Sequence, residues 1–300
     1  MSIFVERPPD YYAATAFDAF VPEADFSLGS ARAAMWTAQL AYETQQPETL
    51  RIAGARWNIS NVTPFARASG FDHADTRGII ARRNDATVVA FAGTDPAVWD
   101  NMLTNIKVLP ASDIGTHRGF ARALEPVWDE VREVVVASAQ PVIFTGHSLG
   151  AALAVLAALR AAELGHAPLA VYTFGSPRVG GIDFAARYDE RLGEVTYRLV
   201  HGDDIVATVP MSQLGFRHVG RYLHCASGEK FDAAAMSGLG SDAPSFTHGL
   251  KRGFAREIAK LWSGQLLSPP GPGSLGPLFK LLPSRLRDHL PDRYIEALKP

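Results

Sequence analysis

The sequence predicts an α/β protein in which helices cover both faces of a mostly parallel central sheet. From about residue 86 onward, short apolar runs that suit buried strands alternate with longer runs of helical spacing. The chain has 300 residues, 47% of them hydrophobic, which is enough for a large core. Ordinary Gly and Pro counts and a charged fraction of 20% exclude collagen-like, disordered and coiled-coil classes.

The first part of the chain predicts a helix and a hairpin. Ala, Leu, Met and Trp recur at helical spacing over residues 30–42, and Ser30 is the expected N-cap. Two β-rich runs, residues 77–82 and 86–92, flank an Arg-Asn-Asp turn segment. This arrangement predicts an antiparallel hairpin.

After the hairpin, helices and strands alternate. We expect helices near residues 96–106, 120–137, 149–164 and 246–262, and strands at 142–145, 169–174, 195–200 and 217–225. A Pro/Gly run at 269–273 predicts a linker before a short helical tail. The expected organisation is one domain over residues 1–300, in which the linker and tail at 269–300 dock back on the rest.

Charge and cysteine content restrict the function classes. The 29 Lys and Arg residues nearly balance the 31 Asp and Glu residues, which argues against nucleic acid as a partner. The one cysteine, Cys225, is expected to be a small buried hydrophobe. No metal-ligand spacing and no nucleotide-binding glycine motif is present, so neither a metal nor a cofactor is expected.

The sequence gives no targeting or membrane signal. The first twelve residues lack a basic region followed by an apolar run. Polar residues interrupt the longest stretch free of Asp, Glu, Lys and Arg, residues 134–159, which therefore does not suit a membrane span. A cytoplasmic location is the resulting expectation.

The strongest chemical signal is a G-x-S-x-G motif centred on Ser148. It follows the apolar run 142–144 and precedes an Ala- and Leu-rich helix, the context that a nucleophilic serine on a strand-to-helix turn requires. Glycine is needed on both sides because a Cβ there would collide with neighbouring backbone. The amide of Leu149, at the helix start, would then point at a developing oxyanion. A chance match of this short pattern is the alternative.

With three further segments, the sequence resembles the class 3 (Rhizomucor-type) lipases of the α/β-hydrolases, bacterial branch. Residues 91–94 with Trp99 and Asn105 resemble the oxyanion loop F-R-G-[ST], residues 172–180 resemble T-[FY]-G-x-P-R-V-G, and residues 201–210 resemble N-x-x-D-x-V-P-x-x-P. The resemblance covers about residues 86–210 and implies the α/β-hydrolase fold. Ala92 stands where the family usually has Arg, and Ala207 where proline is common.

The order Ser, acid, His along the chain restricts the acid and the base. Asp203 and Asp204 both follow the expected strand 195–200, and the resemblance favours Asp204 because it directly precedes Ile-Val. The histidines after it are His218, His224, His248 and His289. His218 and His224 lie in a strand-like run, and His248 lies at the start of a helix. His289 is favoured because its segment resembles the D-H-x-x-x-x-Y-[IL] ending of bacterial class 3 lipases, and the tail must then dock over the sheet.

Thr94 leaves the hairpin strand where an oxyanion loop is expected. Its backbone amide would join that of Leu149, and a helix N-cap is an alternative role for it. The family resemblance implies that the next helix, Asp95 to Val108, is a lid, although a core-packing helix has the same apolar spacing.

These residues predict a serine hydrolase that cleaves carboxylic esters of lipids, a lipase or carboxylesterase working through an acyl-enzyme. The predicted catalytic residues are Ser148, Asp204 and His289, with Thr94 and Leu149 as the oxyanion hole. Expected partners are a lipid or fatty-acyl ester substrate and a transient contact with a lipid interface. The alternatives are an acyltransferase on the same fold and a catalytically silent binding protein.

Overall fold

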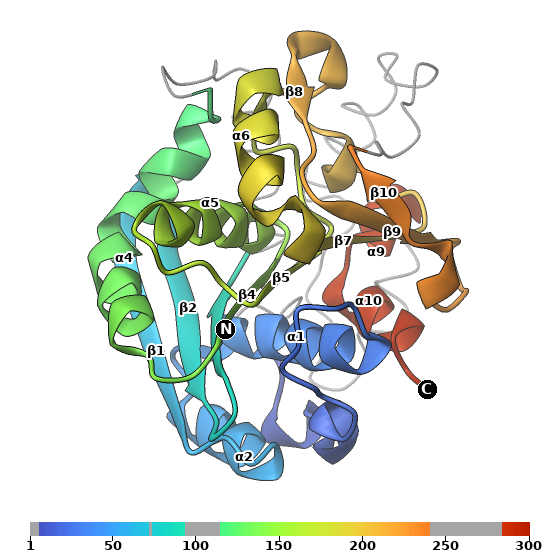
Figure 1. Ribbon diagram of the computed structural model, residues 1–300. Helices are drawn as coiled ribbons and strands as arrows, with labels where there is room; N and C mark the ends of the chain where they lie inside the picture. The colour runs from blue at the N-terminus through green and yellow to red at the C-terminus, as the bar shows by residue number, and fades with distance from the viewer. Residues whose placement is uncertain (1–5, 72–73, 94–114, 241–283) are drawn as a thin grey trace, which may run out of the picture.

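The computed structural model describes residues 6–71, 74–93, 115–240 and 284–300 (Figure 1). Among these residues, eight strands form the main sheet in the order β1-β2-β3-β4-β5-β7-β9-β10. Strands β3 (Thr87–Phe91), β4 (Val142–His147), β5 (Ala170–Phe174), β7 (Thr196–His201) and β9 (Arg221–Cys225) are parallel neighbours. The predicted α/β fold with a mostly parallel central sheet, the α/β-hydrolase class, is confirmed.

Antiparallel strands border the parallel part of the sheet. On one side lie β1 (Asn61–Phe71) and β2 (Ala74–Arg82), and β2 pairs with β3 as the predicted hairpin. On the other side lies β10 (Ser237–Leu239). The run predicted as one late strand is two elements, because β8 (Phe216–Arg217) pairs instead with β6 (Gly180–Gly181) in a separate small sheet.

Helices cover both faces of the sheet because its strands are buried on both sides. Along β3, Val89 and Phe91 face one hydrophobic cluster, whereas Val88 and Ala90 face the other. The first cluster is covered by α4 (Arg118–Ala137), α5 (Leu149–Glu163) and α6 (Ile182–Leu192), and the second by α1 (Leu28–Leu40), α2 (Pro47–Arg56) and α10 (Pro291–Ala297).

The N-cap of α1 differs from the prediction. Ser27 caps the helix, since its hydroxyl accepts a hydrogen bond from the amide of Ser30. Ser30 already lies in the first turn, and its hydroxyl donates to the carbonyl oxygen of Val21. The helix therefore begins earlier than its apolar pattern indicated, because Leu28 and Gly29 complete its first turn.

The two ends of the described chain pack together. Helix α10 lies beside α1 and contacts β7 (Figure 1). Arg7 forms an ion pair with Asp292 at 2.9 Å, and the Arg32 guanidinium donates to the carbonyl oxygen of Leu298. Leu286 and Tyr294 are buried in the two hydrophobic clusters. Residues 284–300 thus pack against the rest of the described chain, and their position brings His289 to the sheet.

None of the described helices combines the length and the apolar character needed to cross a membrane.

Glu43, just after α1, provides a test of how burial couples stability to pH. Its carboxylate accepts hydrogen bonds from the Arg7 amide and the Tyr12 hydroxyl, and burial raises its pKa from 4.5 to about 7. Between these pH values the unfolded chain loses this proton while the folded protein keeps it. The free energy of unfolding should therefore fall as pH rises from about 4.5 to 7, by up to about 3 kcal/mol from this residue.

Glu43→Gln removes this titration. Thermal melts at pH 4.5 and pH 8 should show that the variant gains stability relative to the wild type as pH rises. Glu48→Gln is the control, because Glu48 is exposed and paired only with Arg51 on the surface. A stability difference between Glu43→Gln and the wild type that is the same at both pH values would contradict the prediction.

Candidate active site

Ser148 lies on a strained turn between β4 and α5. Its backbone has φ 59° and ψ −128°, a region that residues other than glycine rarely adopt. The flanking glycines make the turn possible: a Cβ on Gly146 would lie 2.2 Å from the carbonyl oxygen of Gly150, and one on Gly150 would lie 2.1 Å from that of Phe91. The turn holds Ser148 at the carboxyl end of the parallel strands.

Asp204 and His289 form a buried pair, although 85 residues separate them in sequence. Asp204 follows β7, and His289 lies between α9 (Ser284–Asp288) and α10. His289 Nδ1 lies 2.7 Å from Asp204 Oδ2, and the Val206 amide donates to Asp204 Oδ1 at 2.8 Å. Because a carboxylate only accepts, Nδ1 carries the proton and Nε2 is left as the basic nitrogen.

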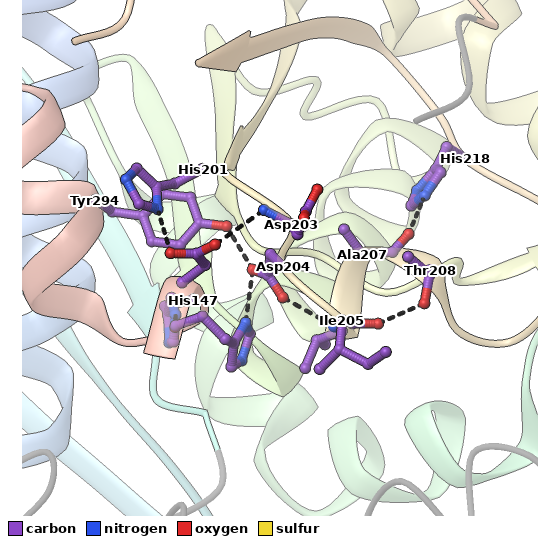
Figure 2. Close-up of polar contacts among 12 residues, drawn as sticks. His147, His201, Asp203, Asp204, Ile205, Ala207, Thr208, His218 and Tyr294 are labelled. Atoms are coloured by element: carbon purple, nitrogen blue, oxygen red, sulfur yellow. Dashed lines mark hydrogen bonds and ion pairs between the residues drawn. The ribbon is translucent and has the colours of Figure 1, made fainter. Parts of the chain in front are cut away.

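A third donor, Tyr294, completes the surroundings of Asp204. Its hydroxyl lies 2.5 Å from Asp204 Oδ2, as Figure 2 shows. Burial raises the pKa of the Asp204 carboxyl, but the charge of His289 and the hydrogen bonds from His289 and Tyr294 outweigh it, so the pKa lies below its ordinary value. Asp204 is thus an ionised carboxylate without contact with solvent.

Two glycines allow the chain segments of the site to approach closely. Gly175 has φ +58°, and a Cβ there would lie 2.5 Å from Asp204 Oδ2 and 2.8 Å from His289 Nδ1. The preceding residue, Phe174, accepts a hydrogen bond from the Ser148 amide at 3.0 Å. A Cβ on Gly93 would lie 3.0 Å from that of Ser148. Ser148, Asp204 and His289 are therefore gathered at the carboxyl ends of neighbouring strands.

The arrangement has the chemistry of an activatable serine. Ser148 Oγ is buried and makes no hydrogen bond within the described part of the chain. A nucleophile and its base often approach to hydrogen-bond distance only when substrate is bound. Leu149 is the first residue of α5, so its amide belongs to the first turn, whose N–H groups lack acceptors within the helix. The predicted oxyanion donor Leu149 thus directly follows Ser148 at the start of α5.

The other candidate residues have different positions. Asp203 is exposed, and His218 and His224 donate to the carbonyl oxygens of Ala207 and Gly202, respectively, so neither ring is bonded to Asp204. Figure 2 shows His218 directed at Ala207 and away from Asp204. Cys225 is buried, and this burial raises its pKa to about 12. The candidates that lie outside the described residues are Thr94, Trp99, Asn105, His248 and the helix expected from Asp95 to Val108.

Within the described ranges, no group of three or more His, Cys, Asp or Glu side chains could hold a metal ion.

Several residues of the site received no role from the sequence. Asp288 is buried, and its carboxylate accepts hydrogen bonds from the Asp203 amide at 3.0 Å and the Ser227 hydroxyl at 2.9 Å. Tyr294 and Asp288 both belong to the C-terminal motif that favoured His289, and that motif was the available signal for them. Nothing in the sequence links Tyr42 to the site, because its contact with His147 spans 105 residues.

Tyr294→Phe tests the third donor to Asp204. The substitution keeps the buried ring and removes one charge-assisted hydrogen bond, so we expect a stability loss of about 1.5–3 kcal/mol. We also expect a roughly 10-fold lower kcat for ester hydrolysis, because Asp204 would hold His289 less firmly. Thermal melts and steady-state kinetics measure the two effects.

Tyr188→Phe is the matched control, since Tyr188 is also buried and its hydroxyl bonds only to Thr196 Oγ1, at 2.9 Å. It should lose about 0.5–1.5 kcal/mol of stability and no activity. Equal effects of the two substitutions on kcat would contradict a role of Tyr294 in positioning Asp204 and His289.

Part of the chain is similar in sequence to known lipases. Residues 88–214 match the family described as lipase (class 3). A secreted mono- and diacylglycerol lipase 1 from Fusarium solani is 41% identical over 109 residues, which are 35% of this chain and 32% of the relative. A lipase from Rhizopus niveus is 35% identical over 161 residues, or 49% of this chain and 41% of the relative. The chain thus spans less than half the length of these relatives.

Solved structures agree in fold. A triacylglycerol lipase whose catalytic centre is formed by a serine protease triad superimposes with a TM-score of 0.59 and 22% identity, covering 73% of this chain and 88% of the other. Lipase II from Rhizopus niveus gives a TM-score of 0.57 and 23% identity, covering 72% and 88%. At these identities the structures establish the fold alone.

The expectation of a cytoplasmic location is wrong. Relatives from Fusarium solani, Penicillium cyclopium and Malassezia globosa are named as secreted lipases, which points away from the cytoplasm. The expectation depended only on the lack of a recognisable leader or membrane span, and such a lack does not determine location.

Residues 88–214 of this chain thus match the class 3 lipase family, and the similarity to fungal lipases is limited to the parts of the chain given above.

Proposed function

We propose that this chain is a serine hydrolase that cleaves carboxylic esters of lipids, with Ser148 as nucleophile, His289 as base and Asp204 as the acid that orients the base. The observation that carries the proposal is the hydrogen bond between His289 Nδ1 and Asp204 Oδ2, at 2.7 Å, beside a serine on a positive-φ turn. The sequence order of the three residues is that of α/β-hydrolases.

The geometry supports a two-step reaction. Ser148 Oγ attacks the ester carbonyl carbon while His289 Nε2 takes its proton, and the amides of Leu149 and Thr94 stabilise the oxyanion. Collapse of the tetrahedral intermediate breaks the bond to the alcohol, which receives the proton from His289. Water, activated by the same histidine, then attacks the acyl-enzyme and releases the carboxylic acid. Asp204 keeps Nδ1 protonated throughout and balances the charge of the imidazolium.

The names of the relatives support a proposed substrate class and a proposed location. Their names specify mono- and diacylglycerols, so glycerol esters of fatty acids are the proposed substrates, with transient contact to a lipid interface. The same names favour an extracellular location. We propose one domain over residues 1–300 whose C-terminal tail completes the site. A place in the bacterial branch is proposed from the C-terminal motif alone, since the relatives named above are fungal.

The direct test is titration of the fatty acid released from emulsified diacylglycerol by the purified chain, with and without added methanol. Release of free acid supports hydrolysis. Methyl ester formed in place of free acid would assign an acyltransferase instead. If neither product forms from diacylglycerol or from a soluble short-chain ester, the chain would be a binding protein on a hydrolase fold.

A further inference from the structure

His147, the residue between Gly146 and the serine, has both ring nitrogens engaged. Its Nε2 lies 2.7 Å from the carbonyl oxygen of His289, and its Nδ1 lies 3.0 Å from the Tyr42 hydroxyl. The ring is fully buried, and its centroid lies 4.6 Å from that of the His289 ring. The side chain thus contacts both the backbone and the ring of the proposed base.

These two contacts fix the tautomer of His147. A carbonyl oxygen can only accept, so Nε2 must carry the proton and donate it to His289. Nδ1 is then the acceptor for the Tyr42 hydroxyl. Burial and the neighbouring His289 lower the pKa of His147 to about 3, so the ring is neutral near pH 7. The neutral His147 ring therefore donates one hydrogen bond, from Nε2–H to the carbonyl oxygen of His289.

Hydrogen bonds on both sides of His289 hold the backbone of the proposed base. His289 follows Asp288 directly, and the hydrogen bonds of the Asp288 carboxylate to Asp203 and Ser227 hold the chain on that side. On the other side, the carbonyl oxygen of His289 accepts a hydrogen bond from His147 Nε2–H. Since His147 is covalently adjacent to Ser148, this hydrogen bond links the backbone of the proposed base to the residue next to the proposed nucleophile.

We propose that His147 is a positioning residue for the hydrolytic reaction, holding the His289 backbone at a fixed place beside Ser148 through its Nε2–H. This inference rests on the proposed function. The residue touches no substrate atom and transfers no proton. A shift of about 1 Å in a base can cost 10²-fold in rate, so loss of this one hydrogen bond should reduce kcat more than KM.

Three substitutions separate the donor from the bulk of the ring. The amide nitrogen of Gln reaches about where Nε2 lies and can donate to His289, whereas that of Asn reaches only about as far as Nδ1. Phe fills the space without a donor. We expect His147→Gln to keep kcat within about threefold of the wild type, and His147→Asn and His147→Phe to lose about 10- to 100-fold in kcat with KM nearly unchanged.

The kinetics are normalised to sites titrated with an alkyl phosphonate, so that unfolded protein does not count. A merely structural His147 would lower melting temperatures and the titratable fraction, but would leave kcat per site unchanged in all three variants. That result, or equal losses for Gln and Asn, would overturn the inference while leaving the hydrolase proposal intact. A wild-type chain that neither hydrolyses esters nor reacts with the phosphonate would overturn both.

A second measurement needs no variant. Long-range ¹H–¹⁵N spectra of the wild-type chain, with histidine labelled, report which ring nitrogen of His147 carries the proton. We expect the Nε2–H tautomer at pH 5 and pH 8 alike. The Nδ1–H tautomer, or a cationic ring at pH 5, would contradict the assigned donor even if every substituted protein failed to fold.

Discussion

Ser148→Ala is expected to lower ester hydrolysis by about 10⁴- to 10⁶-fold with little change in stability. The hydroxyl makes no hydrogen bond within the described residues, so its removal leaves no described partner unsatisfied. Alanine keeps the Cβ that the strained turn already accommodates. Purified wild type and variant should be compared by kcat/KM on a short-chain ester and by thermal melts.

Labelling provides an independent readout of the same residue. An alkyl phosphonate should add once to the wild type, and peptide mapping should place the adduct on Ser148, whereas the variant should remain unlabelled. Ser30→Ala is the control, because Ser30 is another buried serine, whose hydroxyl accepts a hydrogen bond from the Ser27 hydroxyl and donates to the carbonyl oxygen of Val21. Turnover near the wild-type rate in Ser148→Ala, or an adduct at another serine, would refute the assignment of the nucleophile.

His289→Ala should cause a loss of similar size, whereas His248→Ala should leave kcat/KM near the wild-type value. The pair of substitutions tests the two histidines that remain as rivals for the base once His218 and His224 are bonded to backbone carbonyl oxygens. His289 is bonded to Asp204 through Nδ1, so it has the protonation pattern that a base needs at Nε2. Its loss would also leave the buried Asp204 carboxylate with one donor fewer, so some loss of stability should accompany the loss of rate.

Kinetics alone therefore do not suffice for His289→Ala, and activity must be expressed per folded molecule, from the melt or from far-UV circular dichroism. Asp204→Asn adds a further check. It should lower kcat about 10⁴-fold, since the amide no longer enforces the Nδ1–H tautomer. A large loss in His248→Ala combined with an active His289→Ala would transfer the role of base to His248.

Local patterns predicted the elements that are buried on both sides. The strands β3, β4 and β5 are short apolar runs with every residue buried, and α5 is apolar on nearly all sides. Such sequences are stable only as buried strands or as a buried helix. Strand β1 escaped prediction because it is an edge strand containing Pro64, a residue that normally argues against a strand. Helices α2 and α6 were missed because charged residues on their exposed faces hide a narrow apolar stripe.

In the candidate site, too, features that depend on neighbouring residues were predicted from local patterns, whereas contacts between distant residues were not. The strained turn at Ser148 depends on five consecutive residues, Gly146 to Gly150, so the sequence alone predicts its conformation. Asp204 and His289 are not neighbours in sequence, and only the family resemblance selected them from several eligible residues. The bond from His147 to His289 joins residues that are 142 positions apart. No periodicity or motif encodes such a contact, because tertiary packing alone creates it.

The packing of α10 against α1 implies an order in which the catalytic centre becomes competent during synthesis. A nascent chain that has left the ribosome only as far as β9 already contains the serine, the acid and every parallel strand of the sheet. It lacks the proposed base, His289, and α10, which packs against α1. Domains form as their residues emerge, so the site proposed here would be complete only after α10 has packed against α1. The proposed nucleophile and the proposed base would therefore come together late in synthesis, after every described strand of the sheet has been made.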